Sequence, residues 1–550
     1  MATQAPMNRR AKQGVLGGES RRDAFTLPEH QNGSLKGGQA AAAIHSGQRD
    51  GRAVVIGAGF AGIASALRLA ATGTRVTLVD RLPELGGRAR TFRQDGFTFD
   101  AGPTVITAPY LLDELFQLFG ESLYDHVDLR PVWPWYRVQW EDGRTFDYGG
   151  SPEQMCEQIA KFNRRDQDGY LRMLRSAEEI YRIGYEQLGD QPFDTMGSML
   201  KAVPDMVRLG AQRSMYSFVA SHIKDERLRQ VFTFQPLLVG GNPFRTSCIY
   251  ALIQPLEQRF GVHYAMGGTT AVIDALGGLL ERAGVDVRLG DSVRSIRTSG
   301  GSVSAIELES GADLPCDLAV SAGDPVMLYT RLLGDGARHR RTRLRAEQMK
   351  LSMGLFVSYF GTEGTYPDLA HHTILLSDRY KELLGDIFDR GIVPDDPSLY
   401  VHAPTRTDAS MAPDGHECFY ALAPVPNLRL VNDWERRENE MHDLVLERIE
   451  RHMAPSLRDR LVTKFAVTPK YFETELDSPA GAGFSVQPLL TQSAYFRFHN
   501  RCPHYSNLYL AGAGTHPGAG IPGTLCTAKT AMRCMIRDGV VGPSRTGVVG

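Results

Sequence analysis

The chain has 550 residues, of which 42% are hydrophobic and 23% charged, with a formal net charge of −2 at pH 7. This composition is typical of a globular protein of about two or three domains, and the lack of bulk basicity argues against a nucleic-acid partner. The seven cysteines are scattered and never spaced Cys-x-x-Cys, which argues against a disulfide framework or a structural zinc site and fits a reducing cytosol.

The two ends of the chain are expected to lie outside the folded part. Residues 1–51 form a polar, low-complexity arm with paired arginines, a composition that favours disorder, with a weak contact to anionic lipid as the alternative. Residues 541–550 form a short tail. The arm lacks the apolar segment of a secretory signal. No apolar run approaches the ~18 residues of a membrane-spanning helix, so any membrane contact must be peripheral.

The first predicted elements form a strand–helix–strand unit. Residues 52–56 read as a buried strand, residues 61–71 as a helix of small and branched side chains, and residues 75–79 as a second strand that ends at Asp80. The turn between the first strand and the helix carries a Gly-x-Gly-x-x-Gly motif, which comprises Gly57, Gly59, Phe60, Ala61 and Gly62.

Each glycine of this turn has a physical role in binding a dinucleotide. Gly57 permits the tight turn, Gly59 lets the backbone approach a pyrophosphate, and Gly62 lets the helix pack on the strand. The pyrophosphate then lies against the positive end of the helix. The Asp80 carboxylate, at a strand end, can accept hydrogen bonds from ribose hydroxyls. The unit therefore predicts a dinucleotide site, whereas the glycines alone could serve only a tight turn.

A second glycine loop follows Asp80 and favours flavin over nicotinamide. It consists of Gly86, Gly87 and Arg88, which offer backbone N–H groups and a cation to the phosphates of a cofactor. The spacing resembles the acid-x5-Gly-Gly-Arg extension of glutathione-reductase-type flavoproteins, in the subgroup that includes amine oxidases. A surface salt bridge is the alternative role for Arg88.

The middle of the chain mixes helices and short strands. Residues 151–235 read as helices rich in Met, Leu and Tyr. Short strands are predicted at residues 285–289, 293–296, 303–308 and 319–322, and again at 355–360 and 419–423. A charged helix is predicted at residues 434–452.

A third glycine-rich loop lies near the end of the chain, between a strand at residues 508–512 and a helix at residues 524–535. The start of that helix can place partial positive charge near a flavin ring and stabilise its anionic reduced form. His516 could lie beside the ring, although a lone histidine is more often structural. The residues of this segment assigned to the cofactor site are Gly512, Gly514, Gly520 and Ile521.

From residue 52 to about residue 538 the chain resembles the bacterial phytoene desaturases, FAD-dependent carotene desaturases that are related by fold to amine oxidases. The segments that carry the resemblance occur in family order. They are residues 99–107 (FDAGPTVIT), 238–244 (LVGGNPF), 369–373 (LAHHT), 484–494 (FSVQPLLTQSA) and 512–523, which end in PGAGIPG. The segment at 321–324 departs from the family, because Ser-Ala-Gly-Asp stands where Ser-Asn-Ala-Asp is usual.

The resemblance implies an α/β fold with a glutathione-reductase/amine-oxidase-like FAD-binding Rossmann domain, an inserted mixed α+β substrate domain and a helical membrane-associated region. The FAD-binding domain would comprise residues 52–150, 266–330 and 501–540. The helical region would comprise residues 151–265, and the substrate domain residues 331–500. By analogy with this fold, Val293 should offer its backbone N–H and C=O to the adenine ring.

The resemblance also implies an activity: successive dehydrogenations of phytoene towards lycopene or neurosporene, with quinone or oxygen as electron acceptor. The protein would be cytoplasmic and peripherally associated with a membrane lipid surface. A hydroxycarotenoid or C30 desaturase and a carotene isomerase are alternatives. A non-catalytic isoprenoid-binding protein resembling GDP-dissociation inhibitors and an amine oxidase are more distant ones.

The sequence leaves the substrate side open, and the catalytic residues stay unknown. A stripe of methionines and aromatics could line a substrate tunnel or its membrane-facing mouth, or simply form core. It comprises Met196, Met199, Met206, Met215, Tyr216 and Phe218, with Lys201, Arg208 and Arg213 interleaved as in an interfacial helix. By residue type alone, the candidates for the proton acceptor are Asp100, Glu257 and His516.

Overall fold

The computed structural model describes residues 51–543, which lie within one compact unit, Asp50–Gly550. The predicted arm, apart from residue 51, and most of the predicted tail lie outside the described residues. The strands and helices predicted above are all present, within a few residues of their expected bounds. All seven cysteines have free thiols. None of the described helices is both long enough and apolar enough to cross a membrane.

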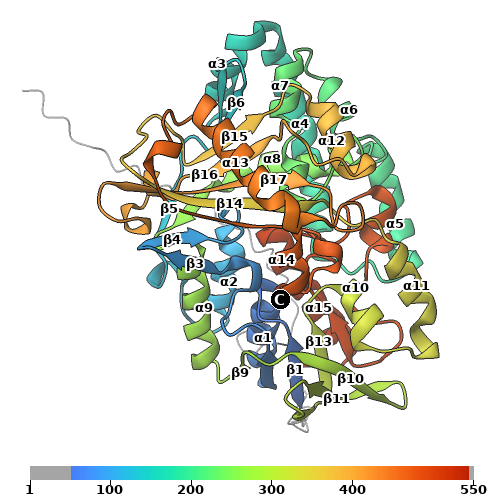
Figure 1. The fold of residues 1–550 in the computed structure, drawn as a ribbon. Helices are drawn as coiled ribbons and strands as arrows, with labels where there is room; N and C mark the ends of the chain where they lie inside the picture. The colour runs from blue at the N-terminus through green and yellow to red at the C-terminus, as the bar shows by residue number, and fades with distance from the viewer. Residues whose placement is uncertain (1–50, 544–550) are drawn as a thin grey trace, which may run out of the picture. The chain divides into compact units, whose positions relative to one another are not determined.

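A five-stranded parallel sheet collects strands from distant parts of the chain (Figure 1). Its order is β19 (Leu508–Leu510), β13 (Leu318–Ser321), β1 (Arg52–Ile56), β2 (Arg75–Val79) and β9 (Asp286–Arg288). The central strand β1 pairs with β13 and β2 in parallel register. Four of its five residues are buried, as expected for a parallel strand covered on both faces.

Helices cover this sheet because their small and branched residues permit close packing. The helix α1 (Phe60–Ala70) packs against α15 (Ile521–Arg537), α9 (Thr269–Arg282) and α2 (Pro109–Gln117). Nearly every residue of α1 is buried. The strand β1, the helix α1 and the helix α15 thus share one core. A three-stranded antiparallel sheet joins this part of the fold and contains β10 (Val293–Ser299), β11 (Ser302–Leu308) and β12 (Asp313–Pro315).

A second, seven-stranded sheet lies above the first in Figure 1. Its order is β18 (Leu461–Val467), β14 (Gly354–Glu363), β17 (His416–Val425), β16 (Leu399–His402), β15 (His372–Leu376), β6 (Tyr136–Trp140) and β7 (Thr145–Tyr148). Only β15 and β6 pair in parallel. Alternate residues of β14 belong to two different hydrophobic cores. Phe356 and Phe360 belong to the core that contains Trp434 of α13 (Trp434–His452). Leu355 and Val357 belong to a second core, which contains Tyr136 of β6.

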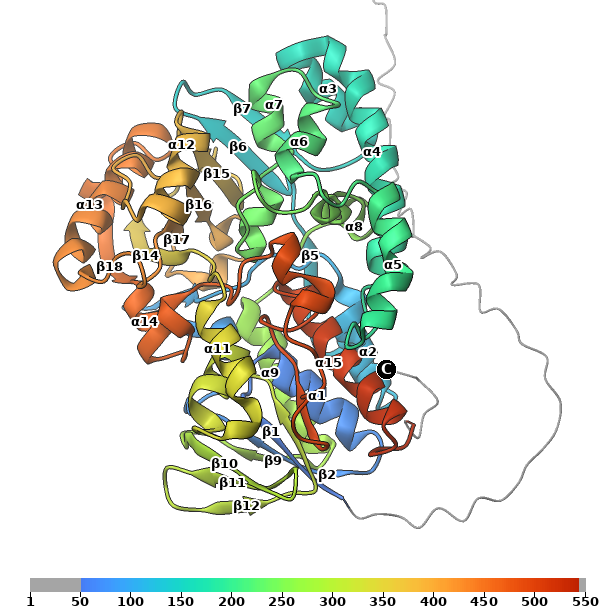
Figure 2. The same cartoon turned by 90° about the vertical axis from the view of Figure 1, so that its right-hand side faces the viewer.

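Helices form one side of the molecule, and Figure 2 shows α4 and α5 along its right-hand edge with α3 at the top. They are α3 (Pro152–Asn163), α4 (Gln167–Tyr181), α5 (Met196–Arg208), α6 (Met215–Ala220), α7 (Glu226–Val231) and α8 (Ile253–Phe260). The remaining helices are α10 (Pro325–Met327), α11 (Arg340–Gln348), α12 (Tyr380–Gly385) and α14 (Pro469–Thr474). The strands β3 (Thr91–Gln94) and β4 (Phe97–Asp100) form an antiparallel hairpin, and β5 (Leu129–Pro131) pairs antiparallel with the distant β8 (His263–Ala265).

Candidate cofactor and substrate cavity

A cavity of about 670 Å³ lies at the carboxyl ends of the parallel strands and continues under the seven-stranded sheet. In open α/β sheets this end of the strands is where ligands bind. Thirteen of the residues assigned to the cofactor line this cavity: Gly57, Gly59, Phe60, Ala61, Asp80, Gly86, Gly87, Arg88, Val293, Gly512, Gly514, Gly520 and Ile521. Gly62 does not line it, in keeping with the packing role assigned to that residue.

The first glycine turn depends on a left-handed backbone at Gly57 and on close packing at Gly62. Gly57 has a φ of +100° and its N–H donates to the carbonyl of Val79, which closes the turn. A Cβ on Gly62 would lie 1.7 Å from the carbonyl oxygen of Gly57. The Asp80 carboxylate accepts from the backbone N–H groups of Ala58, at 2.6 Å, and Leu82, at 2.8 Å. Asp80 therefore fixes the turn in addition to facing the cavity.

The second glycine loop packs directly on the first. The N–H of Gly86 donates to the carbonyl of Ala58 at 2.9 Å, and Gly59 and Gly86 form a β-bridge. Arg88 follows on the cavity lining, where its guanidinium donates to the Ser478 hydroxyl. The Arg88 Nε is buried without a hydrogen-bond partner among the described residues. A cofactor oxygen would satisfy this donor, as buried polar groups require.

The third glycine loop brings a second helix N-terminus to the same cavity. Gly512 has a φ of +106°, and its N–H donates to the Thr527 hydroxyl of α15 at 2.8 Å. The first residues of α1 and of α15 both line the cavity, and no side chain among residues 51–543 caps either helix. Their free N–H groups and positive ends favour anionic groups.

The residues present therefore fit FAD. Three glycine loops, two uncapped helix N-termini and the unpaired Nε of Arg88 surround a single cavity, and a Cβ at Gly62 would disrupt the turn. A parallel sheet with this arrangement defines a dinucleotide-binding flavoprotein.

Beyond the loops, the cavity becomes apolar and aromatic. Leu355 and Val357 of β14, with Leu422 of β17, line it beneath the seven-stranded sheet. Glu257 of α8 is a fully buried carboxyl group on this lining and accepts from the hydroxyls of Tyr136, at 3.1 Å, and Tyr148, at 3.0 Å. Burial raises the pKa of Glu257 to about 8, against the opposing effect of these two hydrogen bonds. The group is therefore largely neutral near pH 7.

The three proton-acceptor candidates differ in their access to the cavity. His516 and Glu257 line it, whereas Asp100 does not. The His516 ring packs edge-on against Phe193, with ring centroids 5.0 Å apart, and burial lowers its pKa to about 4. Asp100 instead accepts from the backbone N–H of Thr269 at 2.7 Å and contacts His402 at 3.3 Å.

A cluster of three buried histidines was missed in the sequence. His371, His372 and His402 place one ring nitrogen each within 4.8 Å of the others. His372 of β15 pairs with His402 of β16 in antiparallel register, which brings the two rings together. The sequence shows the adjacent His371 and His372 in the segment 369–373. It does not show that β15 pairs with β16, which is what brings His402 to them.

The predicted methionine and aromatic stripe does not form one surface. Met215 and Phe218 are buried core residues, and Met206 lines the cavity, whereas Met196 is exposed. Met215 and Phe218 therefore form core, whereas the tunnel-wall and membrane-facing roles of the α5 residues stay predictions, because α5 and α6 are separate helices with different surroundings.

Comparison with known proteins agrees with this geometry. A phytoene desaturase (lycopene-forming) from Paracoccus sp. is 46% identical over 487 residues, or 88% of this chain and 97% of that relative. A phytoene desaturase (neurosporene-forming) from Cereibacter sphaeroides is 41% identical over 483 residues, or 87% of this chain and 93% of that relative. The chain belongs to the flavin-containing amine oxidoreductases, whose family model matches residues 60–536, and within them to the bacterial phytoene desaturases.

Solved structures show the same fold. An oxidoreductase from Methanosarcina mazei superimposes with a TM-score of 0.62 at 16% identity, covering 88% of this chain and 100% of that one. At this identity the likeness concerns the fold alone.

Proposed function

We propose that this protein is an FAD-dependent carotene desaturase that converts phytoene by successive dehydrogenations towards lycopene or neurosporene. The observation that carries the proposal is one cavity in which the three glycine loops meet an apolar, aromatic lining. The alignments with the two desaturase relatives cover 97% and 93% of the length of those relatives.

Different residues of the chain would bind different parts of the cofactor. The turn at Gly57 and Gly59 and the start of α1 would hold the pyrophosphate, Asp80 the ribose and Arg88 a phosphate or ring oxygen, with Val293 against the adenine. When bound, FAD supplies a hydride acceptor. The N-terminus of α15 places partial positive charge where the reduced cofactor would gain negative charge.

A polyene hydrocarbon offers neither charge nor carbonyl, so apolar burial at ~25 cal/mol per Å² must supply its binding. The strands of the seven-stranded sheet supply that lining, and we assign residues 331–500 to the substrate domain on this ground. A neutral Glu257 suits such a cavity, because an ionised carboxylate there would be costly to bury. The lining would contribute to the reaction by orienting the polyene substrate and by excluding water.

A peripheral contact with a membrane would deliver this substrate. One face of α5 is apolar and exposed: Met196 is 51% exposed, Leu200 63%, Val203 37% and Val207 64%. The same helix lines the cavity through Met206 and contacts residues 494–496, where Phe496 is also exposed. Exposed apolar side chains beside a cavity favour a lipid surface.

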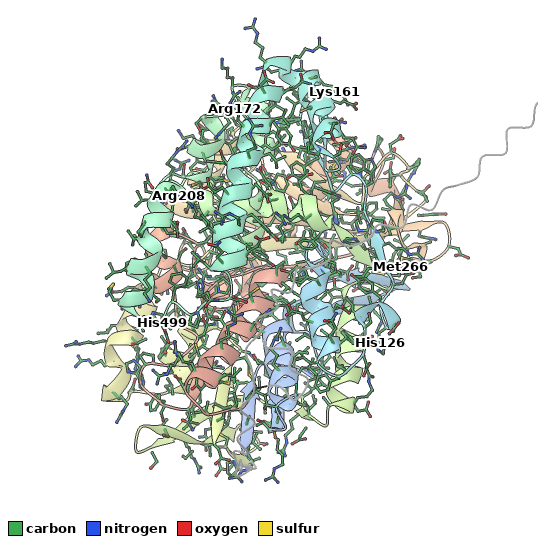
Figure 3. The ribbon with its side chains drawn as sticks, turned by 180° about the vertical axis from the view of Figure 1, so that it is seen from behind. His126, Lys161, Arg172, Arg208, Met266 and His499 are labelled. Atoms are coloured by element: carbon green, nitrogen blue, oxygen red, sulfur yellow. The ribbon has the colours of Figure 1, made fainter. Side chains whose placement is uncertain are left out.

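Charged residues lie on the helices of this side of the molecule (Figure 3). Figure 3 shows Lys161, Arg172 and Arg208 along the helices of this side, and Lys201 of α5 is exposed. Arg208 forms ion pairs with Glu179, at 3.3 Å, and Asp205, at 3.5 Å, so we expect apolar insertion to contribute more than charge. Quinone from the same membrane, or oxygen, would reoxidise the cofactor.

Product analysis in a host that accumulates phytoene tests the proposal. We expect red lycopene or yellow neurosporene in extracts separated by chromatography. Unchanged colourless phytoene, from cells that contain the FAD-loaded protein, would contradict it. Feeding hydroxylated or C30 precursors and cis-carotenes separates the related desaturase and isomerase alternatives.

A further inference from the structure

A chain of hydrogen-bonding groups connects the cavity lining to the buried histidines. The Tyr400 hydroxyl lies 2.7 Å from His372 Nδ1, and His402 Nδ1 lies 3.4 Å from the same nitrogen. His402 Nε2 lies 3.3 Å from the Asp100 carboxyl group. Only Tyr400 of these four residues lines the cavity, and His372, His402 and Asp100 are fully or almost fully buried.

The outer end of this chain lies close to the cofactor loops. The Tyr400 hydroxyl contacts the Thr104 hydroxyl at 3.1 Å, and Thr104 also contacts the Tyr420 hydroxyl at 2.9 Å. Two residues before Thr104, a Cβ on Gly102 would lie 1.9 Å from the carbonyl oxygen of Arg88. The segment that holds Tyr400 therefore packs directly on the Gly-Gly-Arg loop.

Hydrogen-bond requirements assign the tautomers of the two facing rings. His402 must carry its hydrogen on Nε2 to donate to Asp100, which leaves a lone pair on Nδ1. If the Tyr400 hydroxyl donates to His372 Nδ1, that nitrogen is also bare. The two Nδ1 atoms then face each other without a hydrogen between them. One added proton on either Nδ1 would allow a hydrogen bond between the two rings. Burial lowers the pKa of both His372 and His402, so both rings are neutral before a proton arrives.

We propose that Tyr400 accepts the proton released by the dehydrogenation and passes its own hydrogen to His372, with His402 and Asp100 as positioning residues. This inference rests on the proposed function, which removes a hydride from one carbon and a proton from its neighbour. The C–H bond of the neighbour breaks and its electron pair forms the new double bond. The proton binds Tyr400 Oη, while the Tyr400 O–H bond breaks and its hydrogen goes to His372 Nδ1.

The hydrogen bonds of this chain partly offset the cost of burying the proton after transfer, because Asp100 acts against the effect of burial on the pKa of His402. His372 then carries a hydrogen on Nδ1, which can donate to the bare His402 Nδ1. The positive charge is shared through His402 with the Asp100 carboxyl group, which is held by the N–H of Thr269. Burial raises the pKa of Tyr400, so the phenol returns to its neutral form instead of remaining a phenolate.

Two variants test Tyr400 and His372 in the FAD-loaded protein in phytoene-containing liposomes. Tyr400→Phe removes the hydroxyl and keeps the ring, and His372→Gln keeps a hydrogen-bond acceptor for Tyr400 but cannot take up the proton. We expect unchanged FAD content, a KM for phytoene within a few-fold of wild type, and kcat lower by about 10²-fold, the lower end of the contribution of a positioned acid or base. Tyr380→Phe and His442→Gln, buried residues outside the cavity, are matched controls that should leave kcat unchanged.

A spectroscopic readout is independent of turnover. ¹⁵N-histidine NMR should show His372 with a bare Nδ1 in the wild type and a changed Nδ1 signal in Tyr400→Phe. An Nδ1–H on His372, or a kcat that both variants leave unchanged, would overturn the proposal. So would one equivalent of metal bound in the purified protein and lost in His372→Gln. A wild-type protein that binds FAD but leaves phytoene unchanged would instead contradict the proposed function.

Discussion

The two ends of the cavity are built in different ways. At the cofactor end the recognition surface is backbone, and the essential feature is the absence of side chains at Gly57, Gly62 and Gly512. At the substrate end the surface is made of side chains on separate strands and helices, such as Glu257 and Tyr400. We therefore expect the cofactor end to tolerate almost no added volume, and the substrate end to respond to the loss of individual polar groups.

The largest expected effect is at the first glycine turn. Gly62→Ala places a Cβ 1.7 Å from the Gly57 carbonyl oxygen, and overpacking of this kind costs about 3 kcal/mol. We expect the free energy of unfolding to fall by that amount and FAD content to drop below about a tenth of wild type. Absorbance of bound flavin per protein measures this. Gly197→Ala, whose Cβ would lie no closer than 3.9 Å to a neighbour, should retain its flavin; equal losses in both variants would remove the basis of the comparison.

Glu257 gives the substrate end a dependence on pH. Its pKa is raised from 4.5 to about 8 in the folded state, so the folded protein binds the proton more tightly than the unfolded chain. The stabilising contribution is fully present below the unfolded pKa and is lost as pH rises towards 8. Between about pH 5.5 and about pH 7.5, wild type should lose up to about 2.7 kcal/mol more of its free energy of unfolding than Glu257→Gln. Denaturant unfolding at the two pH values checks this, and parallel curves would contradict it.

The apolar face of α5 is expected to act on membrane binding and not on the binding of FAD. Replacing Leu200 and Val207 by Ser removes apolar area worth about 2 kcal/mol, or roughly 30-fold in partitioning. Sedimentation with phospholipid vesicles measures the change, while FAD content should stay constant. Val462→Ser, an exposed residue of β18, is the matched control. If it reduces vesicle binding equally, α5 is not the contact.

Arg88 should give the smallest effect at the cofactor end. Arg88→Gln removes a charge-assisted hydrogen bond worth about 1.5 kcal/mol, or roughly tenfold in FAD affinity. Fluorescence titration of the apoprotein with FAD measures the dissociation constant, with the exposed Arg436→Gln as the control. An affinity for FAD equal to that of wild type would show that Arg88 does not bind the cofactor and only contacts Ser478.

The contrast between the two ends also explains what the sequence could predict. The glycine turns are local patterns, each within a few residues of its own strand and helix, so Gly57, Arg88 and Gly512 were identifiable one at a time. The histidine cluster depends on the pairing of His372 with His402, and Glu257 meets Tyr136 only after α8 packs beneath β6. An interfacial role for α5 was predicted from Met196 with Lys201 and Arg208, but the helical spacing of Leu200, Val203 and Val207, which places them on one face, was not followed.

Anaerobic mixing of the FAD-loaded protein with phytoene in liposomes tests most directly whether the glycine loops and the apolar lining form one active cavity. The flavin absorbance should bleach as a more conjugated polyene appears, and an alkylamine in place of phytoene should leave it unchanged. A flavin that binds stoichiometrically but stays oxidised with phytoene, or that an amine reduces instead, would contradict the assignment.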